Sequence, residues 1–76
     1  MDGERNLAEL KVGDEAVIGR INTTDDKILK KLMALGVLPG MKLVLLQKFP
    51  SYVIKVGNTR IAADDSIARS IVVVKK

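Results

Sequence analysis

The chain of 76 residues contains no histidine and no cysteine. These absences exclude disulfides, the imidazole and thiolate ligands that zinc and iron favour, and the Ser–His and Cys–His pairs of nucleophilic catalysis. Carboxylates remain, but alone they bind only hard cations, and weakly. We therefore expect no enzyme activity, no catalytic residue, no metal site and no cofactor. The lack of cysteine also suits a reducing compartment.

Aromatic residues are nearly absent, with one Phe, one Tyr and no Trp. This scarcity argues against an aromatic groove for Pro-rich peptides and against stacking platforms for single-stranded nucleic acid. The chain has 13 Lys and Arg against 9 Asp and Glu, a net charge of +4. Basic residues are adjacent only at Lys30-Lys31 and Lys75-Lys76. A solvated mixed-charge surface explains this pattern best, and a small basic barrel that binds nucleic acid is the alternative.

Long apolar runs are missing as well, and none approaches the roughly 20 residues that span a bilayer. The N-terminal segment, MDGERNLAEL, is polar and lacks the apolar centre of a signal peptide. We expect a cytoplasmic protein of one domain, residues 1–76, without membrane insertion. Residues 1–6 are expected to be flexible, whereas Leu7 and Leu10 should pack against the domain.

Short apolar stretches separated by turn residues make up most of the chain. They predict strands at residues 15–21, 41–49, 52–56, 59–63 and 71–74, of which the second is the longest. Gly57-Asn58 predicts a two-residue hairpin turn. Ile18 and Ile21 fall on opposite faces unless a β-bulge at Gly19 or Arg20 resets the register. The fold class is therefore mainly β, a small five-stranded antiparallel barrel.

One stretch, TTDDKILKKLMALGVLPG from Thr23 to Gly40, begins with the period of an α-helix. It predicts a helix at residues 24–35, inserted after the first strand, with Thr23 as N-cap and Asp26 completing a capping box. The apolar stripe of this helix consists of Ile28, Leu29, Leu32 and Leu35. We expect this stripe to close one side of the barrel.

Glycine and proline predict how the chain leaves this helix. Gly36 should follow the helix in the left-handed conformation, and Pro39-Gly40 should form a type II turn into the next strand. A short helical turn is predicted at residues 64–68, before the last strand. We assign structural roles in caps and turns to Thr23, Gly36, Pro39, Gly40, Gly57 and Asn58.

Two acidic pairs, Asp25-Asp26 and Asp64-Asp65, lie where these helices are predicted to begin. The positive end of the helix dipole favours carboxylates there. Capping therefore explains both pairs better than acid–base catalysis does.

Two surfaces are candidates for binding a partner. The first is the basic side of the predicted helix with the tip that follows it: Lys27, Lys30, Lys31, Val37 and Leu38. The second is a strip of strand residues out of phase with the expected core: Val44, Leu46, Val72 and Val74. Either the helix and the N-terminal arm cover this strip, or it is exposed to another protein or to a second copy of the chain.

The order of these signals resembles the FeoA family of small cytosolic accessory proteins in bacterial ferrous-iron transport. The similarity runs from Leu7 to Val74. Its motifs are Leu7-x-x-Leu10-x-x-Gly13, Leu32-x-x-Leu35-Gly36-Val37-x-Pro39-Gly40, Leu43-x-Leu45, Ile54-x-Val56-x-Asn58, Ile61-Ala62 and Ala68-x-x-Ile71-x-Val73. The chain departs from the family in its short loop at residues 47–52 and in Ala63-Asp64, where members often have a basic residue.

The resemblance implies an SH3-like barrel and a partner, the membrane transporter FeoB with its cytosolic GTP-binding domain. It also implies recruitment to the inner face of the cytoplasmic membrane and, for the family as a whole, an association with transition metal ion binding. FeoA-like domains also form the C-terminal part of DtxR-type metal-dependent repressors. A free-standing relative of that regulatory domain is therefore a further alternative.

Overall fold

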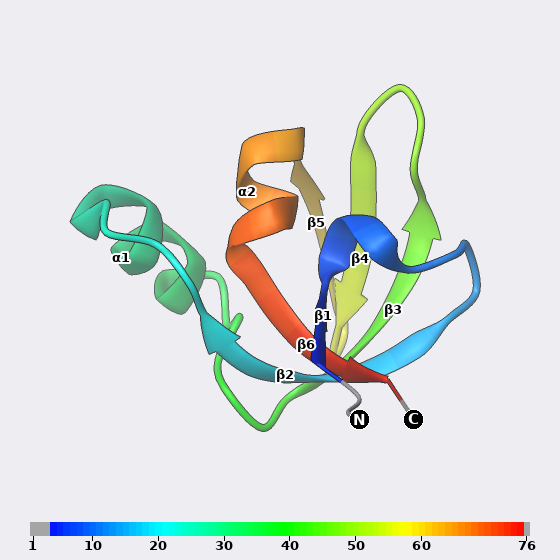
Figure 1. Cartoon of the computed structure of the whole chain (residues 1–76), viewed down its shortest axis with the longest axis horizontal. Helices are drawn as coiled ribbons and strands as arrows, with labels where there is room; N and C mark the ends of the chain where they lie inside the picture. Colours follow the sequence, from blue (N-terminus) through cyan, green and yellow to red (C-terminus); the bar gives the residue numbers. More distant parts are fainter. Residues whose placement is uncertain (1–3, 76) are drawn as a thin grey trace.

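A computed structural model of the chain describes residues 4–75 (Figure 1). Its elements, in chain order, are β1 (Glu4–Asn6), the 3-10 helix η1 (Leu7–Glu9), β2 (Glu15–Ile21), α1 (Asp26–Ala34), β3 (Lys42–Gln47), β4 (Tyr52–Val56), β5 (Thr59–Ala63), α2 (Asp65–Ser70) and β6 (Ile71–Lys75). The predicted class, mainly β and antiparallel, is confirmed. The bounds of β2, β4 and β5 are those predicted from the sequence.

All the strands belong to one sheet in the order β1-β6-β2-β3-β4-β5, and every neighbouring pair is antiparallel. Alternate residues point inward, and Leu43, Leu45, Ile54 and Val56 are all buried. Each such side chain contributes roughly 1.5–3 kcal/mol on burial. The apolar alternation of the strands therefore selects the inner face of the sheet.

The sheet curls into a barrel that helical segments close. Among the described residues β1 and β5 are its two edges and do not pair with each other. α2 contacts β1, β5 and η1, and so fills the space between the edges (Figure 1). Leu7 of η1 and Ala68 of α2 are fully buried there. Side-chain packing thus replaces the hydrogen bonds that would join the edge strands.

The strand β1 was not predicted. Glu4, Arg5 and Asn6 pair with Val74, Val73 and Val72 of β6, which makes six strands instead of five. Residues 4–6 form a strand without a strand pattern of their own, because β6 supplies their backbone partners, while their flexibility stays a prediction. Residues 1–3 lie outside the described residues. The packing of Leu7 and Leu10 is confirmed, since both are buried.

The register shift predicted within β2 is confirmed. Ile18 pairs with Val73 and Arg20 pairs with Val72, so Gly19 is the extra residue of a bulge. A second shift, between Leu45 and Gln47 of β3, was not predicted. β3 ends at Gln47 rather than at residue 49, and it is shorter than β2, so the expectation that it is the longest strand is wrong.

The helix α1 begins two residues later than predicted, and Thr23 is not its N-cap. The Asp25 carboxylate caps the helix by accepting a hydrogen bond from the Lys27 N–H at 2.9 Å. Thr23 Oγ1 instead accepts from the Asp25 N–H at 3.1 Å. The threonine therefore closes a turn ahead of the helix, and this turn places Asp25 in the extended conformation of a cap.

The end of α1 is as predicted. Gly36 has φ +90°, its N–H bonds the Met33 carbonyl at 3.0 Å, and the Val37 N–H bonds the Leu32 carbonyl at 2.9 Å. These two bonds define a Schellman motif. Gly40 has φ +91° and the Met41 N–H bonds the Leu38 carbonyl at 3.1 Å, which confirms the type II turn.

The predicted hairpin turn between β4 and β5 is also confirmed. Val56 pairs with Thr59 across Gly57 and Asn58, and the positive φ of +60° falls on Gly57. This glycine allows the tight reversal that brings the two strands into register.

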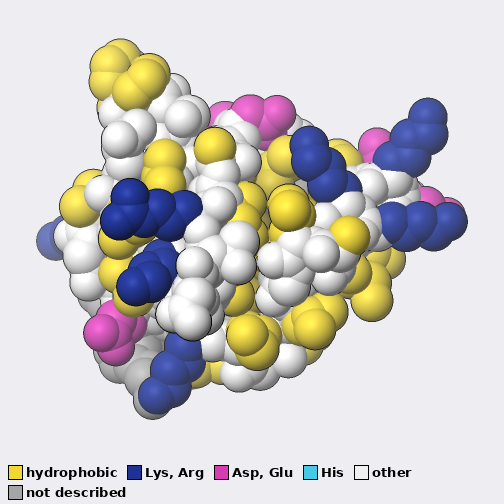
Figure 2. Space-filling model, turned by 180° about the vertical axis from the view of Figure 1, so that it is seen from behind, with side chains coloured by type: hydrophobic (Ala, Val, Ile, Leu, Met, Phe, Trp, Pro, Cys, Tyr) yellow, Lys and Arg dark blue, Asp and Glu magenta, His cyan; other side chains and the backbone are white. Residues whose placement is uncertain are grey.

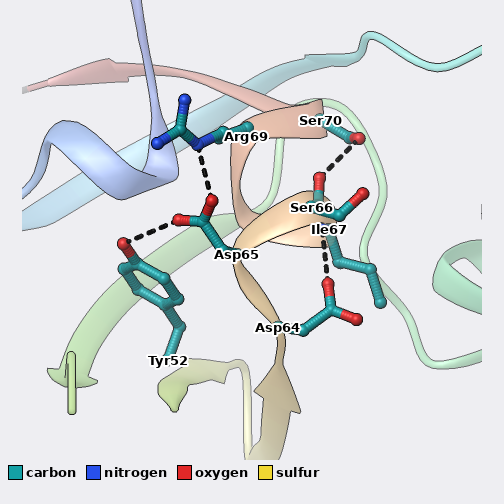
Figure 3. A network of polar contacts seen from close by, with 7 residues as sticks. All are labelled: Tyr52, Asp64, Asp65, Ser66, Ile67, Arg69 and Ser70. Carbon is teal, nitrogen blue, oxygen red and sulfur yellow. Dashed lines mark hydrogen bonds and ion pairs between the residues drawn. The ribbon is translucent and has the colours of Figure 1, made fainter. Parts of the chain in front are cut away.

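The predicted helical turn before β6 is a helix of six residues, α2. Asp64 Oδ1 caps it by accepting from the Ile67 N–H at 2.8 Å. Asp65 accepts from the Tyr52 hydroxyl at 3.3 Å and pairs with the Arg69 Nε at 2.8 Å (Figure 3). Both carboxylates of this acidic pair therefore have structural partners, Asp64 as the cap and Asp65 in side-chain contacts within the first turn.

The left-handed conformation of Gly36 yields a stability prediction. Nothing lies within 4 Å of a Cβ built at Gly36, so Gly36→Ala adds only backbone strain, of about 1 kcal/mol or slightly more. Gly19→Ala is the matched control, because its Cβ makes ordinary contacts and its φ is not positive. Urea unfolding should show a lower midpoint for Gly36→Ala alone. Equal midpoints for the two variants would contradict the prediction.

The position of the cap yields a second prediction. Asp25→Ala should lower the free energy of unfolding by about 1 kcal/mol, because it leaves an N-terminal N–H of α1 without its partner. Thr23→Ala removes one turn hydrogen bond outside the helix and should have a smaller effect. Thermal unfolding followed by circular dichroism distinguishes the two. A larger loss of stability for Thr23→Ala than for Asp25→Ala would contradict the prediction and indicate that Thr23 is the cap.

Candidate partner-binding surfaces

The helix α1 packs less against the barrel than its apolar stripe predicts. Leu32 is buried and Ile28 is half-buried against the core, but Leu35, a third member of the stripe, is exposed. In Figure 1 the helix lies beside the barrel and projects away from it. The expectation that the stripe closes one side of the barrel is therefore wrong, because α2 and η1 do so.

Val37 was expected to meet solvent or a partner at the tip that follows α1, and this expectation is wrong. Its side chain is 0% exposed. The Schellman motif turns the chain back at Gly36 and directs Val37 into the core with Leu32. Leu38, the other tip residue, remains exposed at 39%.

Exposed apolar side chains lie at the C-terminal end of α1 and in the turn after it. We call these four residues, Met33, Leu35, Leu38 and Met41, the α1 patch. Lys27, Lys30 and Lys31 on the same helix are exposed too. Figure 2 shows apolar side chains next to basic ones on this side of the molecule. Exposed apolar area with a polar rim is typical of protein-binding surfaces.

The sequence indicated only part of the α1 patch. Leu38 and the three lysines were predicted, whereas the exposure of Met33, Leu35 and Met41 was not. Leu35 was assigned to the buried stripe because its helical spacing matches that of Leu32. No sequence signal shows that the stripe is wider than the surface it packs against.

The outer strip of strand residues is neither fully covered nor fully exposed. Val72 is buried between Asn6 of β1 and Arg20 of β2, its partners on the neighbouring strands, while Val74 is 41% exposed. Val44 and Leu46 on β3 are half-buried and do not belong to the core. The N-terminal arm therefore accounts for only one end of the strip.

On the outer face of β3, β4 and β5 the pairing places charged residues around Val44. Val44 lies opposite Glu15 of β2 and Lys55 of β4, and Lys55 lies opposite Arg60 of β5. Together these four residues form one row across four strands. A groove of about 380 Å³ is lined by Glu15, Lys42, Leu43, Val44, Lys55 and Gly57. Figure 2 shows basic and apolar side chains together near the β3–β4 hairpin.

Residues 4–75 contain no group of three or more His, Cys, Asp or Glu that could hold a metal ion. No helix among these residues has the length and apolar character needed to span a membrane.

The six antiparallel strands of the described residues, with one helix between the second and third, define a small SH3-like barrel. The FeoA domain model matches residues 5–75, nearly the whole chain. The chain belongs to the FeoA family.

Solved structures agree with this assignment. The chain is 26% identical to an iron uptake regulatory protein (FeoA), covers 96% of its own length and 97% of that protein, and has a TM-score of 0.86. It is 29% identical to Stenotrophomonas maltophilia FeoA complexed with zinc, described as a procaryotic SH3 domain protein, with coverage of 91% and 88% and a TM-score of 0.81. The SH3-like prediction is confirmed. A comparison with curated protein sequences finds no match.

The barrel also occurs inside a longer protein. The chain is 25% identical to T. acidophilum IdeR with a TM-score of 0.90, and it covers 96% of its own length but only 34% of that protein. The shared part is thus one domain of a longer chain.

Proposed function

We propose that this protein is a non-enzymatic accessory factor of bacterial ferrous-iron transport that acts in the cytoplasm by binding a FeoB-type membrane transporter. The observation that carries the proposal is the match of the FeoA domain model to residues 5–75. The Stenotrophomonas maltophilia relative is described as a candidate activating factor of ferrous iron transport, which supports the same role. Binding would recruit the chain to the inner face of the membrane.

The α1 patch is the surface we propose for this contact. Its exposed side chains include two flexible methionines, Met33 and Met41, at 50% and 38% exposure. Methionine adapts its shape to an apolar partner surface, and Leu38 adds an apolar side chain next to the turn. The lysines of α1 lie at its edge, where they would favour an acidic rim on the transporter.

Replacing Leu38 by Glu tests this contact. Leu38→Glu places a charge in the proposed contact and should reduce binding to the cytosolic part of the transporter by about tenfold or more. Val12→Glu is the matched control, because Val12 is also an exposed apolar residue but lies in the turn before β2. Calorimetry with purified partner measures both affinities. Equal affinities would refute the α1 patch, and no binding by the unaltered chain would refute the partner.

The principal alternative is a small basic barrel that binds nucleic acid, favoured by the net charge of +4. Phosphate contacts would make the affinity for an oligonucleotide fall steeply as salt rises, because each contact releases counterions. We expect no measurable binding even at low salt, since no basic cluster is dense enough. Tight, salt-sensitive binding in a filter or anisotropy assay would favour the alternative.

The likeness to part of T. acidophilum IdeR supports another alternative, a free-standing relative of a repressor's C-terminal domain. Such a module would regulate another chain rather than a transporter. Association with a repressor instead of a transporter in cell extracts, confirmed with the two purified proteins, would favour this role.

A further inference from the structure

The cross-strand pair Lys55–Arg60 places two positive charges directly opposite each other on the outer face of the sheet. Side chains at such positions have Cβ atoms about 4.5–5.5 Å apart, and like charges there are destabilising. Neither residue forms an ion pair with a described residue. The hairpin therefore retains an uncompensated repulsion that one acidic side chain at either position would remove.

A third cation lies close to this pair. Lys42 is two residues before Val44 on β3, so both side chains point to the outer face. Lys42 and Lys55 line the groove on either side of Val44, and Lys42 has no ion pair with a described residue either. Glu15 is the one acidic residue in the lining. Positive charge thus exceeds negative charge around an apolar floor.

We infer that the groove on the outer face of β2, β3 and β4 binds an extended acidic segment of another protein. Carboxylates of the segment would lie between Lys42, Lys55 and Arg60, and an apolar side chain would rest on Val44. Residues i and i+2 of an extended chain point to the same side about 6.6 Å apart, which lets one segment reach more than one of these cations.

Two other occupants fit the groove less well. No aromatic residue lines the groove for bases to stack on, and Tyr52 faces α2 on the other side of the sheet. A second copy of this chain offers acidic pairs that cap helices, Asp25-Asp26 and Asp64-Asp65, rather than an extended acidic strand. The chemistry of the groove therefore favours a peptide with alternating acidic and apolar residues.

The inference does not depend on the proposed function, because it concerns a different surface and a probe that is not the transporter. The probe is a capped hexapeptide of alternating Glu and Val, labelled with a fluorophore and titrated with the full chain at low salt. Peptides with Gln or Lys in place of Glu are the controls for charge. We expect saturable binding of the Glu peptide alone.

Variants identify the site. Lys55→Glu and Arg60→Glu should each weaken binding of the Glu peptide by about tenfold, because Lys55 lines the groove and Arg60 lies opposite Lys55 on the neighbouring strand. Each should also raise the urea midpoint, because the opposing pair becomes oppositely charged. Arg5→Glu makes the same charge change on β1, at the far edge of the sheet, and should leave the affinity within about twofold.

If Lys55→Glu and Arg60→Glu weaken binding of the Glu peptide and also raise the urea midpoint, then Lys55 and Arg60 serve recognition and not stability. The inference is overturned if the Glu peptide does not bind, or if Arg5→Glu weakens it as much as Lys55→Glu does. Tighter binding of an oligonucleotide than of the peptide would overturn it in favour of nucleic acid. Sedimentation showing a dimer that Lys55→Glu dissociates would overturn it in favour of self-association.

Discussion

The pairing of β6 with β2 is the interaction on which the rest of the fold depends. It joins the C-terminal strand to the first long strand, and it brings Ile71 and Val73 into the core beside Ile18. β6 then offers its other edge to β1, which has no apolar pattern of its own. Because this pairing joins segments more than 50 residues apart in most of its length, such as Val17 and Val74, its loop-closure entropy must be offset by the core it completes. The bulge at Gly19 keeps both halves of β2 in register with β6.

Closure of the barrel by α2 and η1 explains why α1 is left partly free. In an SH3-like sheet of this size the edges need a cover, and Leu7 and Ala68 provide it from segments adjacent to the edge strands. The insertion between β2 and β3 is then not required for the core beyond Leu32, Ile28 and the buried Val37. The remaining apolar side chains of the insertion stay in contact with solvent. The architecture itself therefore leaves these apolar side chains exposed.

The charges on the outer face of the sheet are not those that would make the β4–β5 hairpin most stable. An opposite-charge pair at Lys55 and Arg60 would strengthen the β4–β5 hairpin, yet both positions are basic. Local rules are often broken where a site serves recognition. The α1 patch and the groove near Val44 differ in chemistry, since one is mainly apolar and the other is cationic. Because the two surfaces differ in chemistry, each would bind a different surface, on one partner or on two.

The sequence by itself determined the features that depend on neighbouring residues. Gly36, Pro39-Gly40 and Gly57 specify their turns through backbone geometry, and the hairpin at Gly57 also implies that residues 55 and 60 face each other. Only the tertiary structure decided which surfaces are covered. β1 exists because β6 is beside it, Val37 is buried because the turn directs it inward, and Leu35 is exposed because no element packs over it. These outcomes depend on contacts between distant segments, which hydrophobic periodicity does not encode.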